Sequence, residues 1–418
     1  MSKFGKLERK IAFFLRKYPW IKEQAKIIYQ NINYTLYRKK YNYKLHNRVS
    51  ISDLNTNKNF GSFWGYYDKS PILNENVLTH TFSKSLTYKS RSKEYINIYL
   101  NEKIISKTNA WNWQQGSMLT WIDENRVFHN IFDNGNYKCK ILNLKNSSIR
   151  ILNSPIYSYN RKTDTALGLN FKRLSKLSPD YGYFCHDHVD PSDFDDNNDG
   201  IFKIFIEDNT SDLIISIDYL KKFKTKPSMI NATHKVNHIE ISPNGLRFIF
   251  LHRWYNKAGE KFSRLISANV DGSEMFILSD DDMVSHCTWR NDDEVVGWMK
   301  KIEFGIGYFA IQDKNGKFKQ LGKGILNEDG HPSFSQCGRY MLTDTYPDRS
   351  RMSTILLYDT KNKDLNFLGE FLSPPKYYGE KRCDLHPRFS DNKNLITFDS
   401  VHAGLRNQYS LNISSFYD

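Results

Sequence analysis

Four of the chain's twelve histidines occupy the same place in a repeated sequence pattern. His238, His286, His331 and His386 each begin a short segment that ends in a turn, and a run rich in β-branched and aromatic residues follows. If these segments are equivalent strands around one axis, their first residues converge, and convergent imidazoles bind divalent transition metals such as Mn, Fe, Zn or Ni. Asp384, two residues before His386, could add an oxygen ligand. The alternative is that each histidine only forms a hydrogen bond to the neighbouring repeat.

Three residues suit acid–base or charge chemistry beside such a metal. His234 lies four residues before His238, so both side chains would emerge on the same side of an extended strand, and either could act as a base. Arg173, in the segment Asn-Phe-Lys-Arg-Leu of an earlier repeat, would contribute a positive charge from the opposite wall. An exposed loop position is the alternative for His234.

Arginines near the last two repeats predict a basic rim. Arg349 and Arg351 follow the segment Asp-Thr-Tyr-Pro-Asp, and Arg382 lies four residues before His386. Guanidinium groups bind carboxylates and phosphates through paired hydrogen bonds, so this rim would hold an acidic substrate. Solvated surface arginines are the alternative interpretation.

From about residue 55 the sequence consists of short apolar runs separated by Gly, Asn, Asp and Pro, which predicts strands and turns. Earlier segments without histidine fit the same frame and bring the number of repeats to seven. The first residues of the seven are Asp68, Met118, Leu174, His238, His286, His331 and His386. Their spacings of 45 to 64 residues suit a four-stranded blade, so the sequence predicts an all-β, seven-bladed β-propeller.

The N-terminal segment differs from the rest in charge and periodicity. Residues 1–50 contain 13 Lys/Arg against 2 Asp/Glu, whereas the whole chain of 418 residues has a net charge of +14. Apolar residues recur at helical spacing between residues 3 and 40, so we expect a basic helical extension over 1–50 and a propeller over 51–418. Residues 1–45 would either lie on an anionic membrane or pack against the propeller. Charge confined to one terminal segment argues against nucleic acid as a partner.

Two observations bear on location. The longest early apolar run, residues 11–15, is too short for a signal peptide or a transmembrane helix. The five cysteines are scattered and form no CxxC pair, which indicates reduced thiols. We therefore expect a cytoplasmic protein, and if residues 1–45 lie on a membrane rather than on the propeller, its inner face would be their contact.

The series of blades and the His-Pro-x-Phe-Ser segments at His331 and His386 resemble oligogalacturonate lyases over about residues 60–415. The resemblance implies a seven-bladed propeller with a manganese site in its channel, held here by His286, His331 and His386. The sequence departs from that family at Arg382-Cys-Asp-Leu-His386, where the family has a closely spaced Gln, His and His ligand set. This departure leaves the identity of the substrate open.

The same resemblance implies a catalytic arginine and a histidine base from the middle blades, which points to Arg173 and to His238 or His234. In β-elimination a metal and an arginine neutralise a uronate carboxylate, and a neutral histidine removes the proton on the adjacent carbon. The sequence therefore predicts a metal-dependent lyase that cleaves an acidic oligosaccharide or polysaccharide. The alternatives are a glycosyltransferase or a glycan-binding propeller of bacterial surface-polysaccharide biosynthesis. The sequence has no P-loop, GxSxG or HExxH motif.

Overall fold

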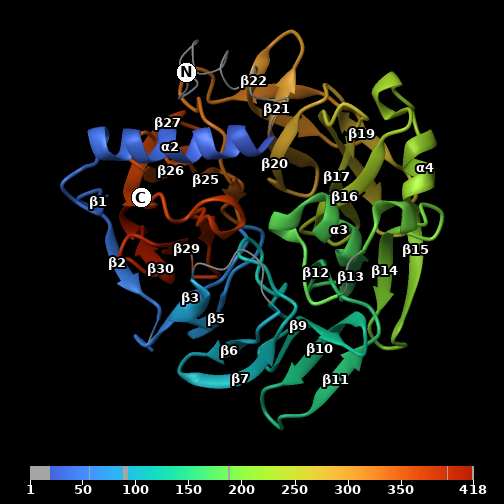
Figure 1. Ribbon diagram of the computed structural model, residues 1–418, viewed down its shortest axis with the longest axis horizontal. Helices are drawn as coiled ribbons and strands as arrows, with labels where there is room; N and C mark the ends of the chain where they lie inside the picture. The colour runs from blue at the N-terminus through green and yellow to red at the C-terminus, as the bar shows by residue number, and fades with distance from the viewer. Residues whose placement is uncertain (1–18, 56, 88–92, 187–188, 393, 417–418) are drawn as a thin grey trace.

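The computed structural model forms seven antiparallel sheets arranged around a central channel (Figure 1). It describes residues 19–55, 57–87, 93–186, 189–392 and 394–416. Each sheet is one blade, so the predicted seven-bladed β-propeller is confirmed. Strands that follow one another in sequence pair within a blade because short connections join them, and the first strand of each blade lies nearest the channel.

All blades share this strand order. Blades one to three contain β3 (Phe60–Phe63), β4 (Ile72–Leu73), β5 (Asn76–Ser83), β6 (Ile96–Leu100) and β7 (Lys103–Thr108); β8 (Thr120–Trp121), β9 (Arg126–Asp133), β10 (Asn136–Asn143) and β11 (Ile149–Leu152); and β12 (Ser158–Asn160), β13 (Thr165–Leu169), β14 (Gly200–Phe205) and β15 (Thr210–Ser216). Blades four and five contain β16 (Thr233–Ile241), β17 (Arg247–Tyr255), β18 (Lys261–Asn269) and β19 (Phe276–Ser279); and β20 (Val284–Trp289), β21 (Glu294–Lys301), β22 (Gly305–Gln312) and β23 (Phe318–Leu321). Blades six and seven contain β24 (Ser333–Phe334), β25 (Tyr340–Asp344), β26 (Met352–Asp359) and β27 (Asp364–Leu372); and β28 (Arg388–Phe389), β29 (Leu395–Ser400) and β30 (Asn407–Asn412).

Two N-terminal strands complete the last two blades. β2 (Ser50–Asp53) pairs with β30 as the outer strand of blade seven, and β1 (Tyr43–Leu45) pairs with β27 at the outer edge of blade six. Leu45 and Ile51 pack against the apolar core of these blades. Strand β1 lies within residues 1–50, which the sequence predicted to be a helical extension. The N- and C-terminal parts of the chain therefore close the ring together.

The first strand of blade three lies at Ser158–Asn160, so the prediction that Leu174 begins this blade was wrong. Leu174 lies in α3 (Phe171–Leu177), which connects β13 to β14. Asn170 begins this helix because its side chain accepts hydrogen bonds from the first backbone N–H groups. The Ser-Pro-Asp-Tyr-Gly sequence that suggested a blade turn forms the 3-10 helix η3 (Pro179–Tyr181).

Two further α-helices accompany the sheets in the described part of the chain. α2 (Pro19–Tyr37) crosses blade six in Figure 1, and α4 (Ile217–Lys222) follows β15. The predicted helix began at residue 3, and its part from 3 to 18 lies outside the described residues. Within the part of the chain that the structure describes, no helix combines the length and apolar composition needed to cross a membrane. The further 3-10 helices are η2 (Lys84–Leu86), η4 (Pro191–Asp193), η5 (Pro227–Met229), η6 (Gly379–Lys381) and η7 (Ser414–Phe416).

The apolar core lies between neighbouring blades. Strand β17 is buried along almost its whole length because β16 and β18 flank it within the sheet and other blades cover both of its faces. Ile249 and Leu251 from this strand share one cluster with Val295 and Phe309 of blade five. Such contacts between facing sheets fix each blade relative to the next, and they thereby position the residues at the channel.

Deleting residues 1–53 should destabilise the propeller more than deleting residues 1–38. The longer deletion removes β1 and β2, leaves β30 with an unpaired edge, and exposes the surface that Leu45 and Ile51 cover. Partial burial of two aliphatic side chains is worth about 2 kcal/mol together, so we expect a lower melting temperature for the longer deletion by calorimetry. Equal melting temperatures for the two deletions would show that the N-terminal strands do not close the ring.

Candidate active site

The four histidines of the repeated pattern, one from each of blades four to seven, form a row in the channel. His238 and His286 lie in β16 and β20, and His331 and His386 each lie two residues before the short strands β24 and β28. The ring centres are 5.9 Å apart between His238 and His286, 4.2 Å between His286 and His331, and 4.2 Å between His331 and His386. All four side chains are buried. Their equivalent places in successive blades bring them side by side.

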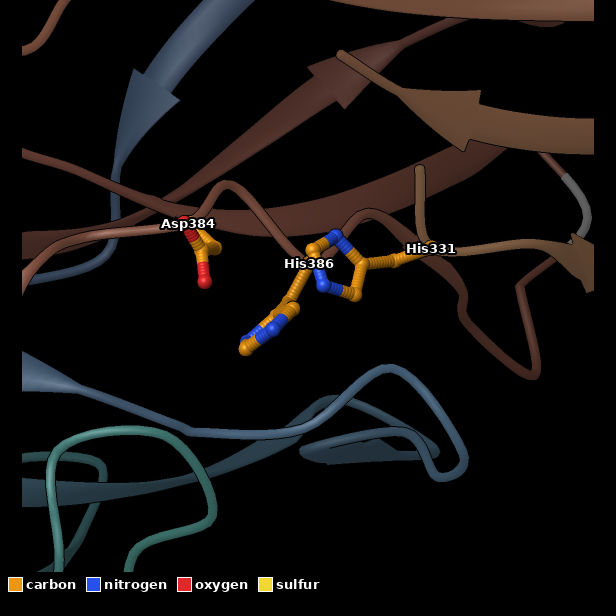
Figure 2. Close-up of side chains that lie close together, drawn as sticks. All are labelled: His331, Asp384 and His386. Atoms are coloured by element: carbon orange, nitrogen blue, oxygen red, sulfur yellow. The ribbon is translucent and has the colours of Figure 1, made fainter. Parts of the chain in front are cut away.

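Three of the predicted metal ligands converge. One ligand atom from each of His331, Asp384 and His386 lies within 4.8 Å of the other two, and Figure 2 shows the three side chains approaching one shared space. Metal–nitrogen and metal–oxygen bonds of about 2.0–2.2 Å place neighbouring ligand atoms roughly 3–4 Å apart. Two imidazoles and a carboxylate gathered within 4.8 Å offer the nitrogen and oxygen donors that divalent transition metals prefer.

Hydrogen bonds fix the tautomers of the two converging histidines. His331 Nδ1 lies 2.8 Å from Asp344 Oδ1, and His386 Nδ1 lies 2.7 Å from the carbonyl oxygen of Gly65. Both partners accept hydrogen bonds, so each Nδ1 carries the proton. Each Nε2 is buried and has no hydrogen-bond partner among the described residues. Two lone pairs are therefore available to a metal, and such ligand-orienting hydrogen bonds are typical of metal sites.

The charges around the cluster favour the ligand forms of two side chains. Burial lowers the pKa of His386 well below its usual value, so this imidazole is neutral. Burial alone would raise the pKa of Asp384, but the Arg382 guanidinium, which donates to Asp384 at 2.7 Å, lowers it, so the carboxylate is ionised. Burial opposes protonation of His331, but the Asp344 carboxylate raises the pKa of His331 above its usual value. A metal at His331 therefore competes with a proton.

His286 and His238 continue the row but have different partners. His286 Nδ1 lies 3.1 Å from Asp329 Oδ1 and donates to it. His238 Nε2 lies 2.6 Å from the hydroxyl of Tyr66. His286, which the sequence analysis proposed as a metal ligand, is not in the three-residue cluster and lines a cavity instead.

A cavity of about 330 Å³ lies beside His286. Its wall carries three cationic side chains and three tyrosines, namely Arg253, Lys261, Arg382, Tyr181, Tyr255 and Tyr346. Asp180 also lines the cavity and pairs with Arg382. Because Arg382 also contacts Asp384, and the ring centre of His286 lies 4.2 Å from that of His331, the cavity adjoins the three-residue cluster. An excess of positive charge beside tyrosine rings suits an anionic sugar.

Sequence reasoning missed Arg253. Its Nη2 donates to the carbonyl oxygens of Val284 and Ser285 at 3.3 and 3.0 Å, and its buried Nε has no partner among the described residues. The charge of Arg253, together with burial, lowers the pKa of Lys261 to about 8. The available signal was an arginine near the end of the otherwise mainly apolar sequence of β17. Asp329 was missed as well, because nothing in the sequence relates it to His286.

Arg173 belongs to a separate network. Its guanidinium lies 2.5 Å from Asp199 and 2.8 Å from Asp196, and it donates to the carbonyl oxygen of His234 at 3.0 Å. The arginine is buried and its charge is already compensated by the two carboxylates. The structure therefore does not bring Arg173 to the histidine row, and we assign it a structural role.

His234 and His238 share a strand but not their surroundings. A β-bulge between Asn237 and Glu240 interrupts the pairing of β16 with β17, and His238 adopts a left-handed backbone conformation with φ of 54°. His234 Nδ1 lies 2.8 Å from Nε2 of His252, and burial lowers the pKa of His234 to about 4. The structure thus leaves His234 inside blade four and only His238 in the row.

The predicted basic rim separates into three environments. Arg351 is buried, donates to a backbone carbonyl at 2.8 Å, and has a pKa that burial lowers to about 10. The guanidinium of Arg349 lies 5.9 Å from the ring centre of Tyr37 at the end of α2. Of the three arginines, Arg382 alone lines the cavity.

The site and the fold together define a seven-bladed β-propeller with a histidine–carboxylate cluster in its channel. No family model and no curated protein matches the sequence. The structure is similar to an oligogalacturonate lyase in complex with manganese, with a TM-score of 0.62, 13% identity, and coverage of 91% of this chain and 98% of that chain. It is also similar to an oligogalacturonate lyase from Vibrio parahaemolyticus, with a TM-score of 0.61, 13% identity, and coverage of 90% of this chain and 98% of that chain. The predicted resemblance to the fold of these lyases is confirmed.

Replacing His331 and His386 together by alanine should abolish stoichiometric metal binding. Changes to groups that only orient ligands weaken metal affinity by roughly 10–100-fold, so loss of two ligands should weaken it by at least ~100-fold. Calorimetric titration with Mn²⁺ and elemental mass spectrometry would measure the effect. A His46→Ala variant, which changes a histidine outside the channel, provides the matched control. Equal metal content in the double variant and the unchanged protein would contradict the assignment.

Proposed function

We propose that this protein is a metal-dependent lyase that cleaves an acidic, uronate-containing oligosaccharide or polysaccharide by β-elimination. The supporting observation is the pair of buried Nε2 atoms of His331 and His386, without hydrogen-bond partners in the described structure, beside Asp384 and a cationic cavity. Proteins of the same fold include an oligogalacturonate lyase in complex with manganese, which makes Mn²⁺ the first metal to test.

The cavity supplies the charge that the reaction needs. Arg253, Lys261 and Arg382 line it and would neutralise the uronate carboxylate, which acidifies the proton on the adjacent carbon. When bound to the His331, Asp384 and His386 cluster, a divalent cation would supply Lewis-acid polarisation of the same carboxylate. Arg253 takes the charge role that the sequence analysis gave to Arg173, because Arg253 lines the cavity and Arg173 does not.

His286 is the proposed base. Burial lowers its pKa, so the ring is neutral, and its Nδ1–H donates to Asp329, which leaves Nε2 as the acceptor. His286 lines the cavity, whereas His238 is engaged with Tyr66 and His234 lies inside blade four. In the reaction Nε2 takes the proton from C5 of the uronate, the C–H electron pair forms the C4=C5 double bond, and the C4–O bond breaks. The departing oxygen leaves with a proton that it acquires from solvent or an acid.

The alternative functions differ from the lyase in what the cavity must contain. A glycoside hydrolase needs two suitably placed carboxyl groups, and Asp180, already paired with Arg382, is the only carboxylate among the described residues that line the cavity. A glycan-binding propeller would use the same cationic wall but release no product. Product formation therefore separates the lyase from the binding protein.

Replacing His286 by alanine should lower kcat on a uronate oligosaccharide by at least ~100-fold, because a general base contributes roughly 10²–10⁴-fold to the rate. The assay is the ultraviolet absorbance of the unsaturated product, with Mn²⁺ present and a panel of uronate oligosaccharides as substrates. His286→Ala should retain its metal and its melting temperature, which distinguishes loss of the base from loss of the site. Absence of unsaturated product from the unchanged protein across the panel, with oligosaccharide binding retained, would indicate a binding propeller.

Substrate affinity should fall as the pH rises through about 8, where Lys261 loses its proton. The ammonium binds the uronate below that pH, so KM should rise above it, by about fivefold for an ion pair worth roughly 1 kcal/mol. A Lys261→Arg variant keeps its charge and should flatten the dependence of KM on pH between about 7 and 9. Lys257→Arg, in the neighbouring turn, is the control. The same pH dependence in both variants would rule out Lys261.

A further inference from the structure

Helix α2 exposes an aliphatic row to the surroundings. Ile21, Ile28, Ile32 and Leu36 recur at spacings of seven, four and four residues, which places them on one face of the helix. Their side chains are between 37% and 71% exposed. A helix that only packs on a globular domain directs its apolar face inward, so this row calls for a partner outside the propeller.

Polar and aromatic groups attach the same helix to the propeller. Asn33 of α2 is buried, and the ring of Tyr37 lies against the guanidinium of Arg349. Directly after the helix, Lys39 and Tyr41 both bind the carboxylate of Glu370 at 2.5 and 2.6 Å. The helix is therefore held with its aliphatic row pointing away from blade six.

A second apolar element is the hairpin that joins β21 and β22. Ile302, Phe304 and Ile306 are between 51% and 76% exposed, and the ring of Phe304 packs edge-on against Phe318. Exposed Lys300 precedes these residues, and Glu303 opposes its charge. Three large apolar side chains exposed on one hairpin are unusual on a protein surface unless they meet a partner.

Both elements lie on the face of the propeller that carries the cavity. The turns between the second and third strands of all blades lie at the same end because the blades repeat one strand order around the axis. The cavity is lined by Tyr255 and Lys261, which flank such a turn in blade four, and by Tyr346, which lies in that of blade six. Arg349, which contacts α2, belongs to the same blade-six turn. In Figure 1, α2 and α3 both cross in front of the sheets.

We propose that this face docks on an anionic lipid bilayer, with the aliphatic row of α2 and the β21–β22 hairpin inserted at the interface. Residues 19–50 carry seven lysines and arginines against one glutamate, and Lys26, Arg38 and Lys40 are exposed around the helix. An aliphatic row flanked by an excess of positive charge complements negatively charged headgroups. A second copy of this basic segment would instead repel it. This proposal does not depend on the lyase activity.

Vesicle co-sedimentation of the full chain tests the proposal. The unchanged protein should bind vesicles of phosphatidylcholine mixed with an equal amount of phosphatidylglycerol at least ~10-fold more tightly than vesicles of pure phosphatidylcholine. An Ile28→Gln, Ile32→Gln, Leu36→Gln variant should lose at least ~10-fold in binding to the mixed vesicles. These side chains are exposed and glutamine is a good helix former, so the variant should keep its melting temperature. An Ile302→Gln, Phe304→Gln variant should weaken binding independently.

Leu246→Gln provides the matched control. Leu246 is 63% exposed but lies in the turn between β16 and β17, at the opposite end of the blade, so its replacement should leave vesicle binding unchanged. Equal binding to the two kinds of vesicle, or unchanged binding of the triple α2 variant, would overturn the proposal. A dimer that the triple variant converts to a monomer, without vesicle binding, would identify a second copy as the partner and would also overturn it.

Discussion

The Asp344 carboxylate fixes the geometry on which the candidate site depends. It accepts hydrogen bonds from the backbone N–H groups of His331 and His386 at 2.8 and 3.1 Å, and from Nδ1 of His331 at 2.8 Å. One buried side chain therefore holds the backbones of two consecutive blade starts and the tautomer of one ring. In the low-dielectric interior such charge-assisted hydrogen bonds are strong, and an ionised carboxylate there requires several of them. The separation of the two histidines thus follows from a single acceptor between them.

A second buried pair links the closure of the ring to the orientation of His386. The Asp399 carboxylate accepts from Arg388 at 2.9 Å and from the backbone N–H of Gly65 at 2.9 Å, so blade seven binds the first blade. The carbonyl oxygen of Gly65 in turn accepts from His386. Gly65 has a φ of 123°, and a Cβ there would lie 2.7 Å from the carbonyl carbon of Gln115. Only glycine fits at this position, because any other residue would be strained at this φ and its Cβ would collide with the Gln115 backbone in the loop before blade two.

The number of blades and the register of the last four could be predicted because turn residues and histidines recur at fixed intervals. The start of blade three could not be predicted. The segment that begins at Leu174 has the turn residues of a blade start, but Asn170 caps a helix there. The charged residues were harder to predict, because their role depends on partners that the fold supplies. Arg173 meets the buried carboxylate of Asp199, whereas the hydrogen bonds of Arg253 within the described part of the chain go to backbone carbonyls, so no carboxylate there pairs with it beside the cavity.

Sequence register places a histidine at the channel, but the partner of its Nδ1 decides what the ring can do. His331 and His386 both donate through Nδ1 and bury a free Nε2, which is the form that binds a metal. His286 also donates to a carboxylate, but its ring borders the cavity, where a free Nε2 can accept a proton from a ligand. His238 has its Nε2 engaged by Tyr66 and is thereby removed from both roles. Equivalent positions in a repeat thus acquire different chemistry because the residues that contact them come from other parts of the chain.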